Sequence, residues 1–265
     1  MPSAESAQPA TPPVLAVEGG RATVRLNRPA QHNRIEPDDL RTLLAHLDAV
    51  AADPTVRVLV LTGTGRTFCA GYDIGALARG DVPVGDAGTP PQFGDVVDRL
   101  EDLDLPTIAA LNGGVFGGGT DLALACDFRI GVEGARMFMP AARLGLQYYA
   151  SGQRRYVERL GLAAAKRLFL AGETLDADAM RSIGYLDEVV PADRLATRVD
   201  ALAASLAAGA PAAVVGMKRT LNAIARGALD RAAVDAAYAA SIRSEDAAEG
   251  VRAWHEKRPP VFRGR

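Results

Sequence analysis

Uninterrupted apolar runs recur through the first half of the chain, separated by amphipathic and glycine-rich segments. The runs at 56–62, 107–111 and 128–132 are typical of strands that are buried on both faces. Residues 14–17 and 22–26, joined by Gly19-Gly20, predict a hairpin, and apolar residues in 37–51 are spaced for one helix face. The alternation of strands, helices and glycine turns therefore predicts βαβ crossovers and a mostly parallel sheet.

The second half of the chain, from Ser151 onward, is predicted to be mainly helical. Asp176 is a plausible N-cap for one helix, and a short strand is predicted at 186–190. The predicted helices lie at 163–170, 176–183, 192–208, 211–226 and 230–254. Residues 79–94, rich in glycine, proline and aspartate, predict a loop, and residues 1–13 predict a disordered tail without the order of a signal peptide.

Composition excludes several classes of function. Of the 265 residues, 48% are hydrophobic and 23% charged, which is enough for a sizeable core, and the net charge of −2 argues against nucleic-acid binding. Two cysteines and three scattered histidines do not predict a disulfide framework or a metal site. No apolar stretch approaches the ~20 residues that span a membrane, so we expect a cytoplasmic protein with no membrane partner.

The segment Asn112 to Asp121 is the most informative stretch, because it carries glycines at 113, 114, 117, 118 and 119 just before a predicted helix. Backbone N–H groups at a helix entry lack intrahelical partners and lie at the positive end of the helix dipole. They can hold an oxygen that becomes anionic during a reaction, and Asp121 follows closely enough to face the same ligand. A tight turn with close helix packing explains the glycines equally well, and no phosphate-binding lysine follows them.

A second small-residue turn, 67–74, follows the buried strand at 56–62. Ligands collect at the carboxyl ends of parallel strands, so the two turns are expected to supply two converging N–H donors. Such a pair is what a thioester oxygen requires as it takes on enolate charge.

Together these segments resemble the crotonase (enoyl-CoA hydratase/isomerase) superfamily over roughly residues 14–265. The resemblance is carried by motifs in the same order along the chain, and any one of them alone is a weak signal. The motifs are 25–29 with Asn33, 68–74, 112–121 with 125–127, 184–190 and 256–259.

The resemblance implies an α/β fold: a crotonase-like spiral of ββα repeats over 14–195, followed by a C-terminal helical trimerisation region over 196–265. It implies a homotrimer or a hexamer, an acyl-CoA thioester substrate, and no separate cofactor, because coenzyme A enters as part of the substrate. The oxyanion-hole N–H groups fall on Tyr72 and Gly118. Positions matching substrate or CoA contacts are Arg28, Ala70, Gly71, Asp73, Ile74, Gly117, Ala141, Tyr149, Trp254 and Lys257.

The resemblance also places two glutamates that position and activate water in hydratases, and here the sequence departs from the pattern. The first falls on Asp121, and the second on Ala141, which cannot accept a proton. Tyr148 and Tyr149 occupy the region where other members carry a substitute catalytic group, although both are equally consistent with a pocket wall or subunit packing.

Three functions stay open on this evidence. In the first, which we favour, Asp121 is the single general acid/base of a lyase or isomerase of the hydratase/isomerase type. In the second, a decarboxylase or hydrolase uses Tyr148 to orient a second polar group of the substrate. In the third, a homologue binds acyl-CoA without turning it over.

Overall fold

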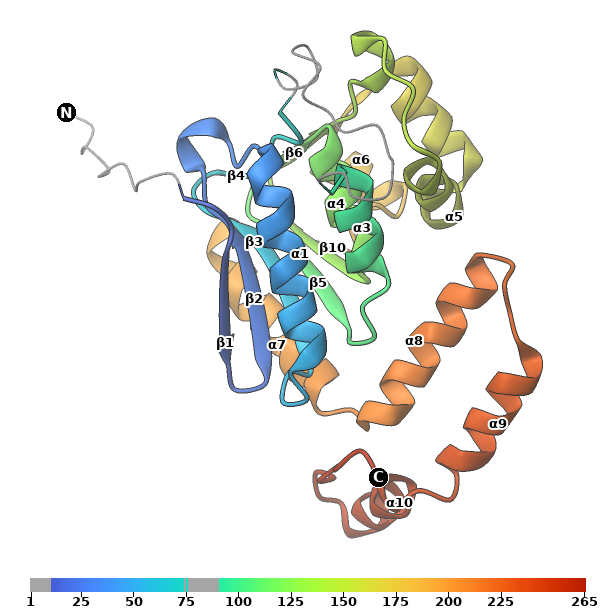
Figure 1. Ribbon diagram of the computed structural model, residues 1–265. Helices are drawn as coiled ribbons and strands as arrows, with labels where there is room; N and C mark the ends of the chain where they lie inside the picture. The colour runs from blue at the N-terminus through green and yellow to red at the C-terminus, as the bar shows by residue number, and fades with distance from the viewer. Residues whose placement is uncertain (1–10, 74, 76–90) are drawn as a thin grey trace, which may run out of the picture.

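The computed structural model describes residues 11–73, 75 and 91–265 (Figure 1). Most of the predicted disordered tail (1–10), most of the predicted loop (79–90) and the candidate contact Ile74 lie outside the described residues.

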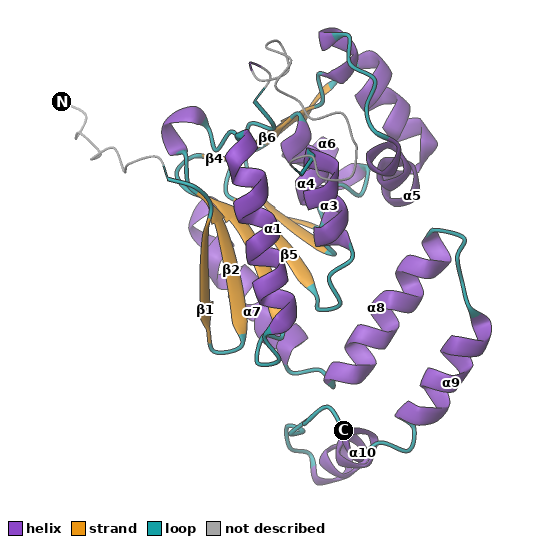
Figure 2. Cartoon of the chain, viewed as in Figure 1, coloured by secondary structure: helices purple, strands orange, loops and turns teal. Residues whose placement is uncertain are grey.

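The described residues form a six-stranded sheet in the order β1-β2-β3-β5-β7-β10 (Figure 2). β1 and β2 are the predicted antiparallel hairpin, and every other neighbouring pair is parallel, as the apolar runs predicted. β3 and β5 are buried along their whole length. The strands are β1 (Val14–Glu18), β2 (Arg21–Leu26), β3 (Val58–Gly63), β5 (Thr107–Leu111), β7 (Phe128–Val132) and β10 (Glu188–Val190).

A second, four-stranded sheet was not predicted from the sequence. Its strands β4 (Thr67–Cys69), β6 (Gly114–Phe116), β8 (Arg136–Phe138) and β9 (Thr174–Asp176) have three residues each. β4, β6 and β8 each follow a strand of the first sheet within a few residues, so the chain runs strand, strand, helix in successive turns. This arrangement is the expected spiral of ββα repeats, which is confirmed.

Helices cover both faces of the first sheet. In Figure 1, α1 and α3 lie in front of it and α7 behind it. Gly161, with φ of 80°, interrupts α5, and the side chain of Asp176 caps α6 as predicted. These helices are α1 (Pro37–Ala52), α3 (Phe93–Glu101), α4 (Gly118–Ala125), α5 (Ala150–Lys166), α6 (Ala177–Ser182) and α7 (Leu195–Ala207), and the short helical turns are Pro29–Gln31, Ala141–Leu144, Arg167–Ala171 and Ala192–Arg194.

The chain leaves the sheet after α7 and forms a helical arm, which we define as residues 211–265 (Figure 1). The arm contains α8 (Pro211–Ala225), α9 (Arg231–Ser241) and α10 (Glu245–Glu256). The sequence predicted one helix over 230–254, but the chain breaks after α9, where the Ser244 side chain caps the first turn of α10.

Within the described residues no single helix has the length and apolarity to cross a membrane. The segments 192–207 and 211–225 reach that length and apolarity only when taken together, and the chain bends by 103° between them.

Candidate functional site

A cavity of about 950 Å³ opens where the second sheet meets α3, α4 and the segment before α5. Its walls come from four stretches far apart in sequence, which are 70–73, 92–98, 116–118 and 139–151. Gln31 and Arg34 complete the described lining. The structure thus brings both predicted glycine turns and both predicted tyrosines to one cavity.

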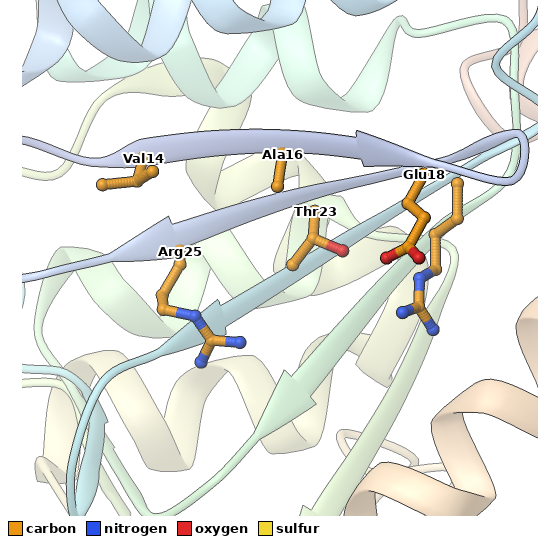
Figure 3. Close-up of a pocket in the computed structure, with 6 residues that line it drawn as sticks. Val14, Ala16, Glu18, Thr23 and Arg25 are labelled. Carbon is orange, nitrogen blue, oxygen red and sulfur yellow. The ribbon is translucent and has the colours of Figure 1, made fainter.

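A smaller hollow, of about 240 Å³, lies on the outer face of the β1–β2 hairpin (Figure 3). Alternate residues of the two paired strands, including Val14, Ala16, Thr23 and Arg25, line it. None of the predicted site residues that the structure describes lines this hollow.

The two glycine turns touch each other at the cavity wall. A Cβ atom on Gly71, whose φ is 92°, would lie 2.9 Å from the backbone nitrogen of Gly118 and 2.8 Å from the carbonyl oxygen of Phe116. Gly117, with φ of 51°, precedes α4, and Gly118 is the first residue of that helix. Only glycine permits this approach, which sets the backbone of Tyr72 beside the N-terminus of α4.

Asp121, in the first turn of α4, has a side chain with 0% exposure and does not line the cavity. The hydroxyl of Tyr149 donates to its Oδ2, and the hydroxyl of Tyr148 makes a longer contact of 3.3 Å with the same oxygen. Oδ1 accepts from Nη1 of Arg155 at 2.7 Å. A Cβ on Gly152 would lie 2.7 Å from Oδ2, so this glycine lets α5 approach the carboxylate. The two tyrosines therefore stand between Asp121 and the cavity.

Aromatic rings continue from these tyrosines along the cavity wall. The rings of Tyr148 and Tyr149 lie 4.5 Å apart between centroids, and Phe93 lies edge-on to Tyr149 at 6.4 Å. Phe93 in turn lies 6.0 Å from Tyr72. Such pairs hold ring orientations and exclude water from the groups behind them.

Burial has the largest effect on the pKa values of Asp121, Tyr148 and Tyr149. It raises the pKa of the Asp121 carboxyl above its ordinary value, and the charge of Arg155 and the tyrosine hydrogen bonds offset part of that rise. Burial, followed by the charge of Asp121, also raises the pKa of Tyr148 and of Tyr149. Both hydroxyls therefore stay protonated at neutral pH, and each can donate to a carboxylate.

The other predicted contacts divide into two sets. Ala70, Gly71, Asp73, Gly117 and Ala141 line the cavity, while their contact with a substrate stays a prediction. Arg28, Trp254 and Lys257 lie outside the described lining. Arg28 is held by Asp39 at 2.9 Å and Glu36 at 3.3 Å, whereas Trp254 is 83% exposed on the arm.

Several residues of the site were missed by sequence reasoning. Asp98 and Phe93 line the cavity, and Arg155 and Glu101 form a buried ion pair behind Asp121. Charged residues on amphipathic helices are usually solvated, so nothing marked these as buried. The one usable signal was the i, i+3 spacing of Asp98 and Glu101, which places two carboxylates on one helix face.

In the described part of the chain, no group of three or more histidine, cysteine or acidic side chains is arranged to hold a metal ion.

Both the sequence and the fold of this chain are similar to those of known proteins. Residues 17–265 match the family model for enoyl-CoA hydratase/isomerase. The chain is 33% identical over 242 residues to the 2,3-dehydroadipyl-CoA hydratase of Escherichia coli, covering 91% of this chain and 94% of that one. It is 37% identical over 220 residues to the carnitinyl-CoA dehydratase of Proteus mirabilis, covering 80% and 84% respectively.

Solved structures agree with these sequence matches. The crystal structure of an enoyl-CoA hydratase/isomerase family member aligns with a TM-score of 0.89 at 31% identity, over 97% of this chain and 98% of that chain. The enoyl-CoA hydratase of Bacillus anthracis aligns with a TM-score of 0.85 at 29% identity, over 96% and 100%. The similarity therefore extends over nearly the whole length of each protein.

Proposed function

Because the chain belongs to the enoyl-CoA hydratase/isomerase family, as its motifs indicated, we propose that it moves a proton on the acyl chain of a CoA thioester. A backbone oxyanion hole stabilises the enolate, and Asp121 is the single carboxylate that serves as general acid/base. The observation that carries this proposal is the hydrogen bond from the cavity-lining Tyr149 to the buried Asp121, beside the two glycine turns.

The oxyanion hole is assigned to the N–H groups of Tyr72 and Gly118. Both residues line the cavity, and the contact between Gly71 and Gly118 brings their backbones together. Gly118 is also the first residue of α4, where the helix dipole favours negative charge. Fixed donors of this kind stabilise charge that develops on the thioester oxygen, and removing one donor typically costs ~10²–10³ in rate.

The proton route follows from the position of Asp121 behind the tyrosines. The α-proton of the acyl chain passes to Oη of Tyr149 while the hydroxyl proton of Tyr149 passes to Oδ2 of Asp121. The electron pair of the C–H bond moves into the thioester, which becomes the enolate held by the two N–H groups. Return of the proton at the γ-carbon completes a double-bond shift. Burial raises the pKa of Asp121 and so makes it a stronger base, which favours the first step, removal of the α-proton.

Hydration requires a second group to activate water. The family resemblance places that group, a glutamate, at position 141, where this chain has an alanine on the cavity wall. Isomerisation is for that reason chemically easier here than hydration. The names of both relatives describe the addition or removal of water on a CoA thioester, so hydration is the second reaction to assay.

The CoA part of the substrate is assigned to the other predicted contacts, Arg28, Trp254 and Lys257. Trp254 and Lys257 lie on the helical arm, away from the cavity of the same chain. We therefore propose that they reach CoA in a homotrimer, or in a hexamer of two trimers. Light-scattering mass of the purified protein tests this assembly, and a monomer that binds acyl-CoA normally would contradict it.

Two alternatives have support from specific contacts. The Tyr148 hydroxyl, 3.3 Å from Asp121, is placed to orient a second polar group of the substrate, as a decarboxylase or hydrolase requires. The ion pair between Asp121 and Arg155 satisfies the carboxylate without any substrate, which suits a homologue that only binds acyl-CoA.

Ultraviolet absorbance of the conjugated enoyl thioester separates these functions. A β,γ-enoyl-CoA that gains this absorbance on mixing supports the proposal, and crotonyl-CoA that loses it indicates hydration. Thermal stabilisation by both ligands with neither absorbance change would overturn the proposal in favour of binding alone.

A further inference from the structure

Arg155, on α5, lies at the centre of a buried ionic cluster behind the cavity. Its side chain has 0% exposure and contacts three carboxylates. Nη1 lies 2.7 Å from Asp121, Nη2 lies 2.6 Å from Asp98, and Nε lies 3.1 Å from Oε1 of Glu101. Arg155 itself is outside the cavity lining, so any influence on substrate passes through its partners.

A guanidinium keeps its charge throughout the pH range in which proteins are folded. Asp121 therefore always faces a positive charge on its Oδ1 side, whereas the described side chains that contact its Oδ2 are the neutral hydroxyls of Tyr148 and Tyr149. The nearby hydroxyls of Tyr156 and Tyr185 are occupied by the side chain and carbonyl of Thr120. Among the described residues, Arg155 is the cation paired with Asp121.

Glu101 anchors Arg155 from the opposite side. This carboxylate is only 3% exposed and also contacts Arg154 at 2.6 Å, Arg159 at 3.5 Å and Arg226 at 2.8 Å. Burial opposes its ionisation, but Arg155 and the other arginines outweigh that and lower the pKa of Glu101 to about 2. Glu101 is therefore ionised whenever the enzyme is folded at ordinary pH, and it holds Arg155 in place.

We propose that Arg155, anchored by Glu101, is the positioning residue that keeps Asp121 ionised and turns its Oδ2 toward the hydroxyls of Tyr148 and Tyr149. This rests on the proposed function only in taking Asp121 as the base. Asp98 and Glu101 hold Nη2 and Nε of the planar guanidinium, so its Nη1 is fixed toward Oδ1 of Asp121, and Oδ2 is left to the two tyrosines. A freely rotating ammonium group is held less well in this way. The ionic cluster thus keeps Asp121 as a hydrogen-bond acceptor for Tyr149. Tyr149 donates its hydroxyl proton to Asp121 and presents its oxygen lone pairs to the substrate.

The test is a ¹³C NMR titration of the Asp121 carboxyl carbon, together with the pH profile of kcat, in matched variants. Arg155→Met removes the charge, and we expect the Asp121 midpoint to rise by at least about one pH unit. Because the base must be ionised, the acid limb of kcat moves to higher pH by the same amount, while KM changes less than kcat. Arg155→Lys restores the charge, and its midpoint is expected between those of wild type and Arg155→Met.

Arg154→Met is the control, since it removes a neighbouring guanidinium from Glu101 and leaves the Arg155–Asp121 contact in place. We expect its Asp121 midpoint to match that of wild type. Should Arg155→Met fail to fold, Arg155→Gln replaces it, because its side-chain amide carries no charge but can still donate a hydrogen bond to a neighbouring carboxylate.

An Asp121 midpoint that is the same in wild type and in the folded Arg155 variant would overturn the assignment. The titration needs no turnover, so its result is independent of the proposed function. A shifted midpoint in a protein that turns over no acyl-CoA would contradict the proposed function and leave the role of Arg155 standing.

Discussion

The sheet region and the helical arm bury their apolar side chains to very different extents. β3 and β5 are buried along their full length, and α1 buries Leu40, Leu43, Leu47 and Val50. In the arm, α8 buries only Lys218, α9 buries nothing, and α10 buries Asp246 and Ala253. The large exposed apolar side chains of the arm are Met217, Leu221, Ile224, Leu229, Tyr238, Ile242, Val251, Trp254 and Val261.

This difference in burial indicates that the sheet region is stabilised by its own core, whereas the arm has few buried side chains of its own. All the described residues that line the cavity belong to the sheet region, whereas the arm is joined to that region by ion pairs such as those of Lys218 and Arg226. Large exposed apolar patches are rare on monomeric proteins, and these side chains are the ones that the proposed assembly of several copies would cover. Chemistry is then expected to depend on the sheet region, and CoA affinity and assembly on the arm.

The largest expected effect separates the proposed catalytic group from a predicted CoA contact. Asp121→Asn removes the proposed base, so kcat should fall by ~10³-fold or more, with little change in KM. Trp254→Ala, in the arm, should raise KM and leave kcat nearly unchanged, because it removes binding alone. Steady-state kinetics on both variants measures this, and equal kcat for Asp121→Asn and wild type would refute the role of Asp121.

A matched pair of leucines tests the difference in burial directly. Leu59, 1% exposed in β3, and Leu221, 64% exposed in α8, are each replaced by alanine. Leu59→Ala should cost about 2–5 kcal/mol of unfolding free energy, because it leaves a cavity in a packed core. In dilute, dissociated protein, Leu221→Ala should cost no more than ~0.5 kcal/mol. Denaturant unfolding decides the matter, and similar costs for both would show that the arm is packed within one chain.

The attachment of the arm gives a third comparison, between neighbouring cations of α8. Lys218 is nearly buried and donates to the Leu105 carbonyl at 2.9 Å and to Asp127 at 2.7 Å. Lys218→Met takes this donor from the Leu105 carbonyl and leaves the Asp127 carboxylate with the two hydrogen bonds from Thr107 but without its cation, at an expected cost of about 1–3 kcal/mol. Arg219→Met breaks only the exposed pair with Asp104 and should cost ~0.5 kcal/mol or less. Thermal unfolding of both variants measures the two costs, and equal costs would contradict a buried attachment.

The smallest expected effect is a difference in pH dependence between two glutamates. Arginines lower the pKa of Glu101 from 4.5 to about 2 despite its burial, and Arg258 lowers that of Glu249 in the arm to about 2. A lowered pKa contributes stability that is present above pH 4.5 and lost as pH falls toward 2. Glu101→Gln should flatten this acid limb of the melting temperature. Glu249→Gln should change it less and only at low salt, because Arg258 is exposed and screened by solvent.

How far the sequence sufficed depends on the length of each element. Elements such as α1, β3, β5 and β7 were predicted because they are long enough to show a pattern. The helix repeats its apolar positions over several turns, and each strand is a mainly apolar run of at least five residues. β4, β6, β8 and β9 were missed because three residues carry no readable period, whereas β10, of the same length, was predicted within the longer segment 186–190. The ββα spiral was predicted only through the family resemblance.

The candidate site was predictable where a motif marked it. Gly71, Gly118, Tyr148 and Tyr149 were named from sequence and share one cavity. Arg155 and Glu101 were not, because an arginine in a helix gives no sign of whether tertiary packing will bury it. That Asp121 lies behind the tyrosines and contacts the cavity only through them is likewise a property of the packed structure.

The most direct test of the account is exchange of the α-protons of butyryl-CoA in D₂O, followed by ¹H NMR. It reports enolate formation alone, without needing water addition or a double-bond shift. The account predicts exchange by wild-type protein, and a loss of ~10²-fold or more in both Asp121→Asn and Tyr149→Phe. Exchange at the wild-type rate in both variants, or no exchange by wild-type protein that binds the thioester, would contradict it.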